Sequence, residues 1–91
     1  MLTALLRKAL KAKAHKLEPV VQIGAKGLTE EVIAEIDRAL EAHELIKVRA
    51  GSLDRDARED AFGSICERTG AESVQQVGKV FVLYRKKPTD E

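Results

Sequence analysis

Three local signals meet in the stretch Val20-Val21-Gln22-Ile23-Gly24-Ala25-Lys26-Gly27-Leu28-Thr29-Glu30-Glu31. The apolar run 20–23 predicts a short buried strand, and a Gly-x-x-Gly turn that carries a lysine follows it directly. Thr29 then stands where a helix N-cap belongs, with two glutamates in the first turn behind it. The stretch therefore predicts a strand, a glycine loop and a helix in immediate succession.

The glycine loop is a candidate phosphate site. Gly24 and Gly27 let the backbone come close to a ligand, because no Cβ holds it away. The following helix offers unpaired N–H groups and a positive dipole end, and Lys26 adds a cation. A nucleic-acid backbone is the most plausible source of the phosphate. The spacing matches neither a Walker loop nor a dinucleotide fingerprint, and a Gly-x-x-Gly can also be a simple turn.

The rest of the chain predicts two further helices and three further strands around this stretch. A leucine stripe favours a helix in residues 1–17, formed by Leu2, Leu5, Leu6, Ala9 and Leu10. Downstream, we expect a helix over 29–43, a strand over 45–50 and a helix over 53–69, with Gly70 just after its end. Residues 74–77 and 80–84 predict a hairpin with Gly78-Lys79 as its turn.

The order α-β-α-β-α-β-β predicts an α+β fold with a small, mixed, four-stranded sheet packed by helices. Each strand–helix–strand unit should place its strands parallel, and the hairpin should add an antiparallel strand. Residues 80–84 are apolar on both sides, so the N-terminal helix is expected to cover part of one face. We expect one domain over 1–87 and a mobile tail over 88–91.

Composition narrows the class of protein. The chain has 91 residues, of which 44% are apolar, and this excludes intrinsic disorder. No apolar stretch is long enough to span a bilayer, and the only cysteine, Cys66, cannot form an internal disulfide, which suits a reducing cytoplasm. The basic N-terminal segment partly resembles a transit peptide, but it lacks serine and its leucines recur at helical spacing, so we interpret it as a structural helix.

Charge is segregated along the chain, although the net charge is only +1. Residues 1–27 carry six basic side chains and a single acid, Glu18, whereas residues 28–72 carry six basic and twelve acidic side chains. Such a chain can fold with one basic and one acidic face, and an anionic polymer would bind the basic one. Both faces could also be ordinary solvated surfaces.

The residues that enzymes need do not converge in this sequence. His15 and His43 lie far apart, and no spacing fits metal ligands, so we expect no catalytic residue, metal or cofactor. Cys66 lies on an apolar helix face and is expected to be a buried structural thiol. With few aromatic residues, the chain cannot build a stacking platform for single strands. Phosphate contacts to structured RNA are the better expectation.

With these residues in view, the chain resembles the chloroplast RNA splicing and ribosome maturation (CRM) domain family, whose free-standing bacterial members are the YhbY-type proteins. The resemblance covers nearly the whole chain. The matching stretches are Ala14-His15-Lys16-Leu17-Glu18-Pro19-Val20-Val21-Gln22-Ile23-Gly24, Gly27-Leu28-Thr29, Ala34-Glu35-Ile36-Asp37, His43-Glu44-Leu45-Ile46-Lys47-Val48, Val77-Gly78-Lys79 and Val82-Leu83-Tyr84-Arg85.

This resemblance implies an RNA-binding module with a glycine loop similar to that of KH domains. It also implies a fold similar to the C-terminal domain of bacterial translation initiation factor three. Free-standing members are associated with the precursor of the large ribosomal subunit, so a role in its assembly is implied. Position 25, often lysine or polar in such loops, is alanine here, which leaves Lys26 as the only charge of the loop.

The leading hypothesis is a non-catalytic, cytoplasmic protein that binds large-subunit ribosomal RNA or its precursor particle, with no membrane or small-molecule partner. The sequence does not indicate an oligomeric state. The candidate RNA-binding residues are Gly24, Ala25, Lys26, Gly27, Lys8, Lys11, Lys13, Lys16, Lys47, Arg49, Lys79 and Arg85.

Three rival functions stay open. The main one is a protein–protein module whose acidic middle helices engage a ribosomal protein or assembly factor, in which case charge reversal at Glu30, Glu35 or Glu41 would matter most. A small RNA-directed enzyme is more distant and would need His15 or His43. DNA binding is compatible with the charge, but no recognition-helix arrangement is evident.

Overall fold

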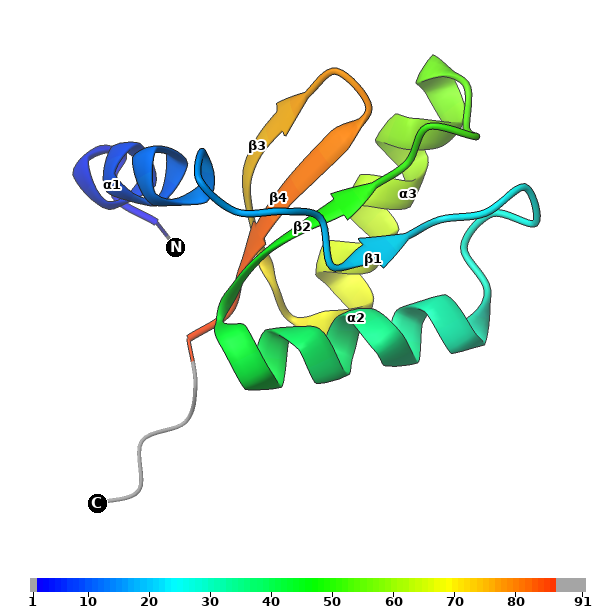
Figure 1. Ribbon diagram of the computed structural model, residues 1–91, viewed down its shortest axis with the longest axis horizontal. Coiled ribbons are helices and arrows are strands. Elements are labelled where there is room, and N and C mark those ends of the chain that lie inside the picture. The colour runs from blue at the N-terminus through cyan, green and yellow to red at the C-terminus, as the bar shows by residue number, and fades with distance from the viewer. Residues whose placement is uncertain (1, 87–91) are drawn as a thin grey trace.

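The computed structural model describes residues 2–86, and its elements follow the predicted order. The tail predicted over 88–91 lies outside the described residues. Figure 1 shows a central sheet with α1 apart from the two other helices, which pack side by side against the sheet. The elements are α1 (Ala4–Ala14), β1 (Val21–Gln22), α2 (Glu30–His43), β2 (Leu45–Arg49), α3 (Arg55–Thr69), β3 (Glu72–Val77) and β4 (Val80–Tyr84).

The four strands form one mixed sheet in the order β1-β2-β4-β3, which confirms the predicted α+β fold class. β1 pairs with β2 in parallel, and β4 pairs antiparallel with both β2 and β3. β2 and β3 therefore run in the same direction, as expected, but β4 lies between them. A strand that is apolar on both faces occupies the centre of the sheet, where both of its faces are covered.

The larger core lies between the sheet and the pair α2 and α3. Ile46 and Val48 of β2 and Phe81 and Leu83 of β4 point into it, because alternate residues of a strand face the same side. The rings of Phe62 and Phe81 stack with their centroids 4.5 Å apart and their planes 5° apart. The strand and the helix that flank the glycine loop both pack into this core, through Val21, Ile23 and Ile33.

α1 covers the opposite face of the sheet over a second, smaller core. Leu10 and Ala14 pack there with Val82, as the apolar character of β4 predicted. The predicted leucine stripe is wrong in part, because Leu5 is 80% exposed and Leu6 is 41% exposed. The buried line along the helix instead passes through Leu10 and Ala14, one turn further along. None of the helices within residues 2–86 is long and apolar enough to cross a membrane.

The helix ends show why these segments stop where they do. The side chain of Thr29 accepts a hydrogen bond from the N–H of Val32 at 3.2 Å, which confirms the predicted N-cap. Asp54 caps α3 in the same way, so this helix begins two residues later than predicted. Gly70 ends α3 in the left-handed conformation with a φ of 73°.

β3 begins at Glu72, earlier than predicted, and a bulge interrupts its pairing with β4 between Ser73 and Gln75.

Candidate nucleic-acid interface

The loop Gly24–Gly27 is a tight turn held firmly at its base. The N–H of Gly27 donates to the carbonyl of Gly24 at 3.0 Å and closes the turn. On the side of the strand, the N–H of Ile23 donates to the carbonyl of Arg49 at 2.8 Å. The hydroxyl of Ser52 donates to the carbonyl of Ile23, also at 2.8 Å. The loop is therefore anchored to the end of β2 and to the segment that follows it, and its tip with Lys26 is exposed.

The two glycines have different physical roles in this turn. Gly27 has a φ of 78°, a conformation in which any other L-residue is strained. Gly24 has no such constraint, and a Cβ built on it meets nothing within 4 Å. The fold therefore explains the glycine at position 27, whereas the bare backbone at position 24 leaves room for an outside partner to approach.

The start of α2 offers less positive potential than the sequence suggested. Thr29 already caps it, and Glu30 and Glu31 lie in its first turn, where they offset the helix dipole. Both carboxylate oxygens of Glu30 accept hydrogen bonds from Arg68 at 2.7 Å. The hydrogen bond and charge of Arg68 hold the pKa of Glu30 below its ordinary value. The cation of Lys26 and the loop backbone are left as the main attraction for an anion at this position.

Basic side chains from β2 and from the hairpin turn gather beside the loop. Arg49 pairs across the sheet with Gln22, the last residue of β1, two positions before the loop. The carbonyl of Lys79, in the hairpin turn, accepts from the N–H of Ala50 at 2.7 Å. Lys47 lies on the same face of β2 as Arg49, opposite the larger core. We call Lys26, Lys47, Arg49 and Lys79 the basic face.

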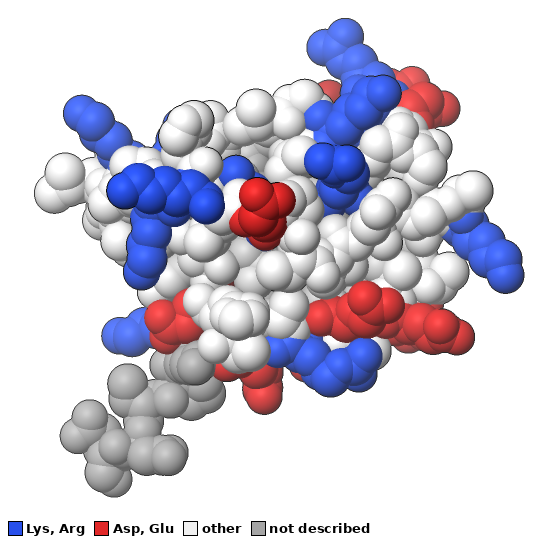
Figure 2. All heavy atoms as spheres, in the orientation of Figure 1, with Lys and Arg blue, Asp and Glu red and all other residues white. Residues whose placement is uncertain are grey.

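Figure 2 shows how the charges are distributed in space. Blue side chains lie over α1, the end of β2, the hairpin turn and the glycine loop, and red side chains gather along α2 and near the start of α3. The segregation along the chain thus becomes a partial segregation on the surface. Glu18, in the segment between α1 and β1, is the one acid in the basic N-terminal part and is exposed.

The N-terminal basic residues separate into two groups. Lys8, Lys11, Lys13 and Lys16 are exposed, and Lys11 borders the open part of the sheet beside Lys47 and Arg49. Arg7, which sequence reasoning did not single out, instead donates hydrogen bonds to the backbone carbonyls of Ser73 and Val74. These hydrogen bonds hold α1 against β3, so the side chain of Arg7 has a structural role.

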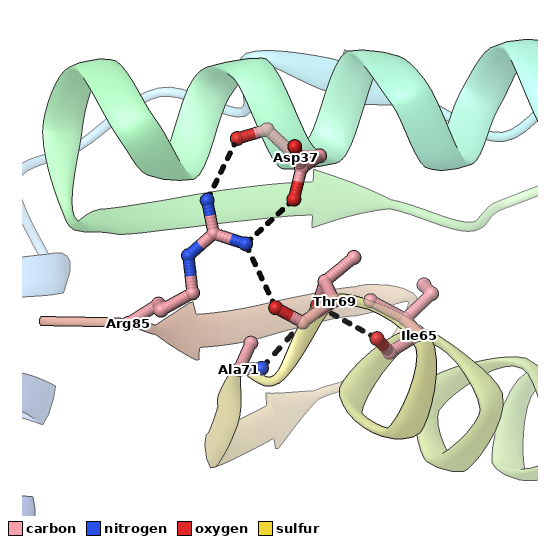
Figure 3. A network of polar contacts seen from close by, with 5 residues as sticks. All are labelled: Asp37, Ile65, Thr69, Ala71 and Arg85. Carbon is pink, nitrogen blue, oxygen red and sulfur yellow. Dashed lines mark hydrogen bonds and ion pairs between the residues drawn. The ribbon is translucent and has the colours of Figure 1, made fainter. Parts of the chain in front are cut away.

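Arg85 lies apart from the basic face, at the opposite end of β4, and its side chain is engaged within the fold. Figure 3 shows its guanidinium reaching from the end of β4 to α2 and to the last residue of α3. It donates to Asp37 Oδ1 at 2.6 Å, to the Asp37 carbonyl at 3.1 Å and to the Thr69 carbonyl at 2.7 Å. We call this arrangement the Arg85 clasp.

The two histidines and the cysteine lie apart from one another in the part of the chain that the structure describes. Within residues 2–86, no group of three or more His, Cys, Asp or Glu side chains could hold a metal ion. His15 follows α1 and His43 ends α2, and they border different hollows of the surface. Cys66 is half-buried beside Phe62 on α3, less enclosed than the sequence suggested.

Cys66 is expected to be a slow nucleophile. Burial, with a smaller effect from the negative charge of Glu72, raises the pKa of its thiol above the ordinary value. The neutral thiol should therefore predominate at neutral pH, and iodoacetamide should alkylate it more slowly than it alkylates the urea-unfolded chain. The pKa of Cys66 is higher in the folded protein than in the unfolded chain. The free energy of unfolding therefore keeps the full contribution of this thiol below the unfolded pKa and loses it as pH rises through the folded pKa. Equal alkylation rates in both states at pH 7.5 would contradict this prediction.

These observations define a class of protein: a small α+β domain with an exposed glycine loop between a strand and a helix, and a basic face beside that loop. The chain belongs to the CRS1/YhbY (CRM) domain family, whose sequence pattern matches residues 2–85. The family membership predicted from the sequence is thereby confirmed.

Relatives and a solved structure extend the match over the whole domain. A Haemophilus influenzae protein named RNA-binding protein is 48% identical over 82 residues, which cover 90% of this chain and 81% of the relative. The Bacillus subtilis protein named probable RNA-binding protein YqeI is 35% identical over 86 residues, covering 94% of this chain and 90% of the relative. The solution structure of a hypothetical Staphylococcus aureus protein, described as a candidate RNA binder, superposes with a TM-score of 0.85 at 35% identity and covers 100% of this chain and 95% of that one.

Proposed function

We propose that the protein is a non-catalytic, cytoplasmic RNA-binding protein that docks on folded ribosomal RNA during assembly of the large subunit. The observation that carries the proposal is the convergence of the glycine loop, Arg49 and Lys79 at one end of the sheet, where backbone hydrogen bonds hold all three. Membership of the CRM family and relatives named RNA-binding proteins support RNA as the ligand.

The chemistry of the basic face favours a phosphate backbone as the target. Its cations are lysine and arginine, which neutralise phosphates and release condensed counterions from RNA. Gly24 allows the loop backbone to lie against a phosphate, and Lys26 pairs with it. Aromatic side chains take no part, since Phe62 and Phe81 stack on each other at the larger core and Tyr84 packs against the smaller one. Recognition therefore depends on backbone shape, which structured RNA provides.

Charge reversal at the loop tests the proposal directly. We expect Lys26→Glu to weaken binding to a large-subunit ribosomal RNA fragment about tenfold, with a salt dependence shallower by about one unit in log K against log salt. Fluorescence anisotropy across a salt series measures both. Gly24→Ala should also weaken binding while the circular dichroism spectrum stays unchanged, because its Cβ meets no protein atom.

The matched control is Lys86→Glu, the same charge change at an exposed residue just beyond the far end of β4. It should bind RNA like the wild type. If Lys26→Glu and Lys86→Glu lose affinity equally, the loop has no special role and only net charge matters. If neither they nor the wild type bind at low salt, RNA binding itself is refuted.

The acidic surface of α2 supports the rival function less well. Glu30 is paired with Arg68, whereas Glu35 and Glu41 are exposed. A basic protein partner would bind through those two residues. Affinity for the ribosomal particle that is lost on Glu35→Lys and Glu41→Lys, but kept in Lys26→Glu, would favour this reading over RNA docking.

A further inference from the structure

A groove opens on the sheet where α1 stops covering it. Its volume is about 280 Å³, and its lining includes Lys11 at the end of α1 together with residues of β2, β3 and β4. α1 packs on the half of this face that holds Val82, through Leu10 and Ala14. The other half, toward the hairpin turn and the glycine loop, has no helix over it.

The floor of the groove is apolar. The register of the sheet places Val80 between Arg49 of β2 and Val77 of β3, in one row across three strands. The next row places Val82 between Lys47 and Gln75. Val77 is 55% exposed and Val80 is half-buried, so an apolar strip lies open to solvent beside two cations. We call this strip, formed by Val77 and Val80, the valine strip, and its exposed apolar surface can lie against the face of a nucleobase.

The rim of the groove is positively charged. Lys11, Lys47 and Arg49 line it, and its lining contains no acidic side chain. Within residues 2–86, the side chains of Lys47 and Arg49 form no hydrogen bond or ion pair, so both cations are available to a ligand. Charge complementarity therefore calls for an anionic occupant, and the valine strip calls for one with an apolar face.

We propose that this groove takes one unstacked nucleotide of the bound RNA, with its base on the valine strip and its phosphates on the cations of the rim. This inference rests on the proposed function and adds to it the kind of RNA element that is bound. Because paired bases stay stacked inside a duplex, a base can enter the groove only from a bulge or a loop. The preferred ligand is then a helix interrupted by an unpaired nucleotide, with the duplex backbone held by the glycine loop.

The small size of the groove favours one nucleotide over several. At about 280 Å³ it falls just below the range of about 300–1,000 Å³ that is typical of drug-sized ligand pockets. A groove of this size has room for one base, and its exposed apolar floor consists of only Val77 and Val80. This small floor distinguishes the groove from the extended stacking platforms of single-strand binders.

The test compares two RNA hairpins that differ only in one bulged 2-aminopurine nucleotide. We expect the wild type to bind the bulged hairpin about tenfold more tightly than the fully paired one, since an unpaired base has no base pair to break and leaves the helix at a lower cost. The 2-aminopurine fluorescence should change on binding. Val80→Met, which extends an unbranched side chain over the valine strip without changing charge, should reduce the affinity ratio to about one.

Controls keep the outcomes distinct. Val20→Met makes the same change at a 50% exposed valine outside the groove and should keep the tenfold ratio. Arg49→Gln should lower the ratio, whereas Arg55→Gln, at an exposed arginine at the start of α3, should not. Circular dichroism verifies the fold of each variant.

If the wild type binds both hairpins equally and Lys26→Glu weakens both, the groove proposal is overturned and the RNA-docking function stands. If no RNA binds, both fall together. If a polyglutamate peptide binds the wild type, competes with RNA and loses affinity on Val80→Met while the bulge has no effect, the groove is a peptide site and the nucleotide assignment is wrong.

Discussion

Phe81→Ala is expected to lower the free energy of unfolding by about 3–5 kcal/mol. Phe81 is fully buried at the centre of the sheet and stacks on Phe62 with a centroid separation of 4.5 Å. Its removal would leave a cavity between β4 and α3 and would also abolish the ring contact. A domain of 91 residues has a total stability of about 5–14 kcal/mol, so this single change would remove a large share of it.

Urea unfolding followed by circular dichroism measures this loss. Val77→Ala is the matched control, because it truncates an apolar side chain of the same hairpin that is 55% exposed. The control should change stability by no more than about 0.5 kcal/mol. A loss below about 1 kcal/mol for Phe81→Ala would contradict this prediction. It would mean that the surrounding side chains fill the space and that the stacked pair contributes little to the stability of the core.

Arg85→Ala is expected to destabilise the fold by about 2 kcal/mol, the order of magnitude for hydrogen bonds to a charged group. The clasp joins three elements, and its loss leaves the carbonyl of Thr69, a residue that is 8% exposed, without this donor. The Asp37 carboxylate is about half exposed and can regain water, which limits the cost. Arg38→Ala, which removes an exposed arginine from the neighbouring position on α2, is the control and should have little effect.

The Arg85→Ala variant also tests whether Arg85 stabilises the fold or binds RNA. Because Asp37 already pairs with its charge, the folded Arg85→Ala protein should bind RNA within about twofold of the wild type, whereas Lys26→Glu should show the reverse pattern of retained stability and lost binding. Unchanged stability together with a large loss of RNA affinity would restore Arg85 to the RNA-binding surface, as the sequence had suggested.

The features that the sequence predicted well are those with local causes. The strand, glycine loop and helix of residues 20–43 follow from an apolar run, two glycines and the Thr29 cap, all within a few residues of their partners. The position of Lys47 and Arg49 on the face opposite the larger core follows from simple alternation along β2. For this reason the glycine loop and the β2 part of the basic face could be identified before the fold.

Other features depend on contacts between distant residues. Arg85 was counted as a surface cation because its partners, Asp37 and the carbonyl of Thr69, lie 48 and 16 residues away in the chain. Arg7 meets β3 across an even longer separation. The groove was missed for the same reason, since its valine strip exists only because β4 lies between β2 and β3. Residues 80–84 are apolar on both faces of their strand, and this pattern was the signal in the sequence that β4 lies at the centre of the sheet.

The edges of the sheet have a consequence for solubility. The two outer strands are β1, which has only two residues in the ladder, and β3, which is interrupted by a bulge and held by Arg7. An edge that is long, flat and regular would offer its free N–H and carbonyl groups as a template for the strand of another molecule. Neither outer strand does so here. The protein can therefore present a bare, partly apolar sheet face to a ligand while giving its own copies little opportunity to extend the sheet into aggregates.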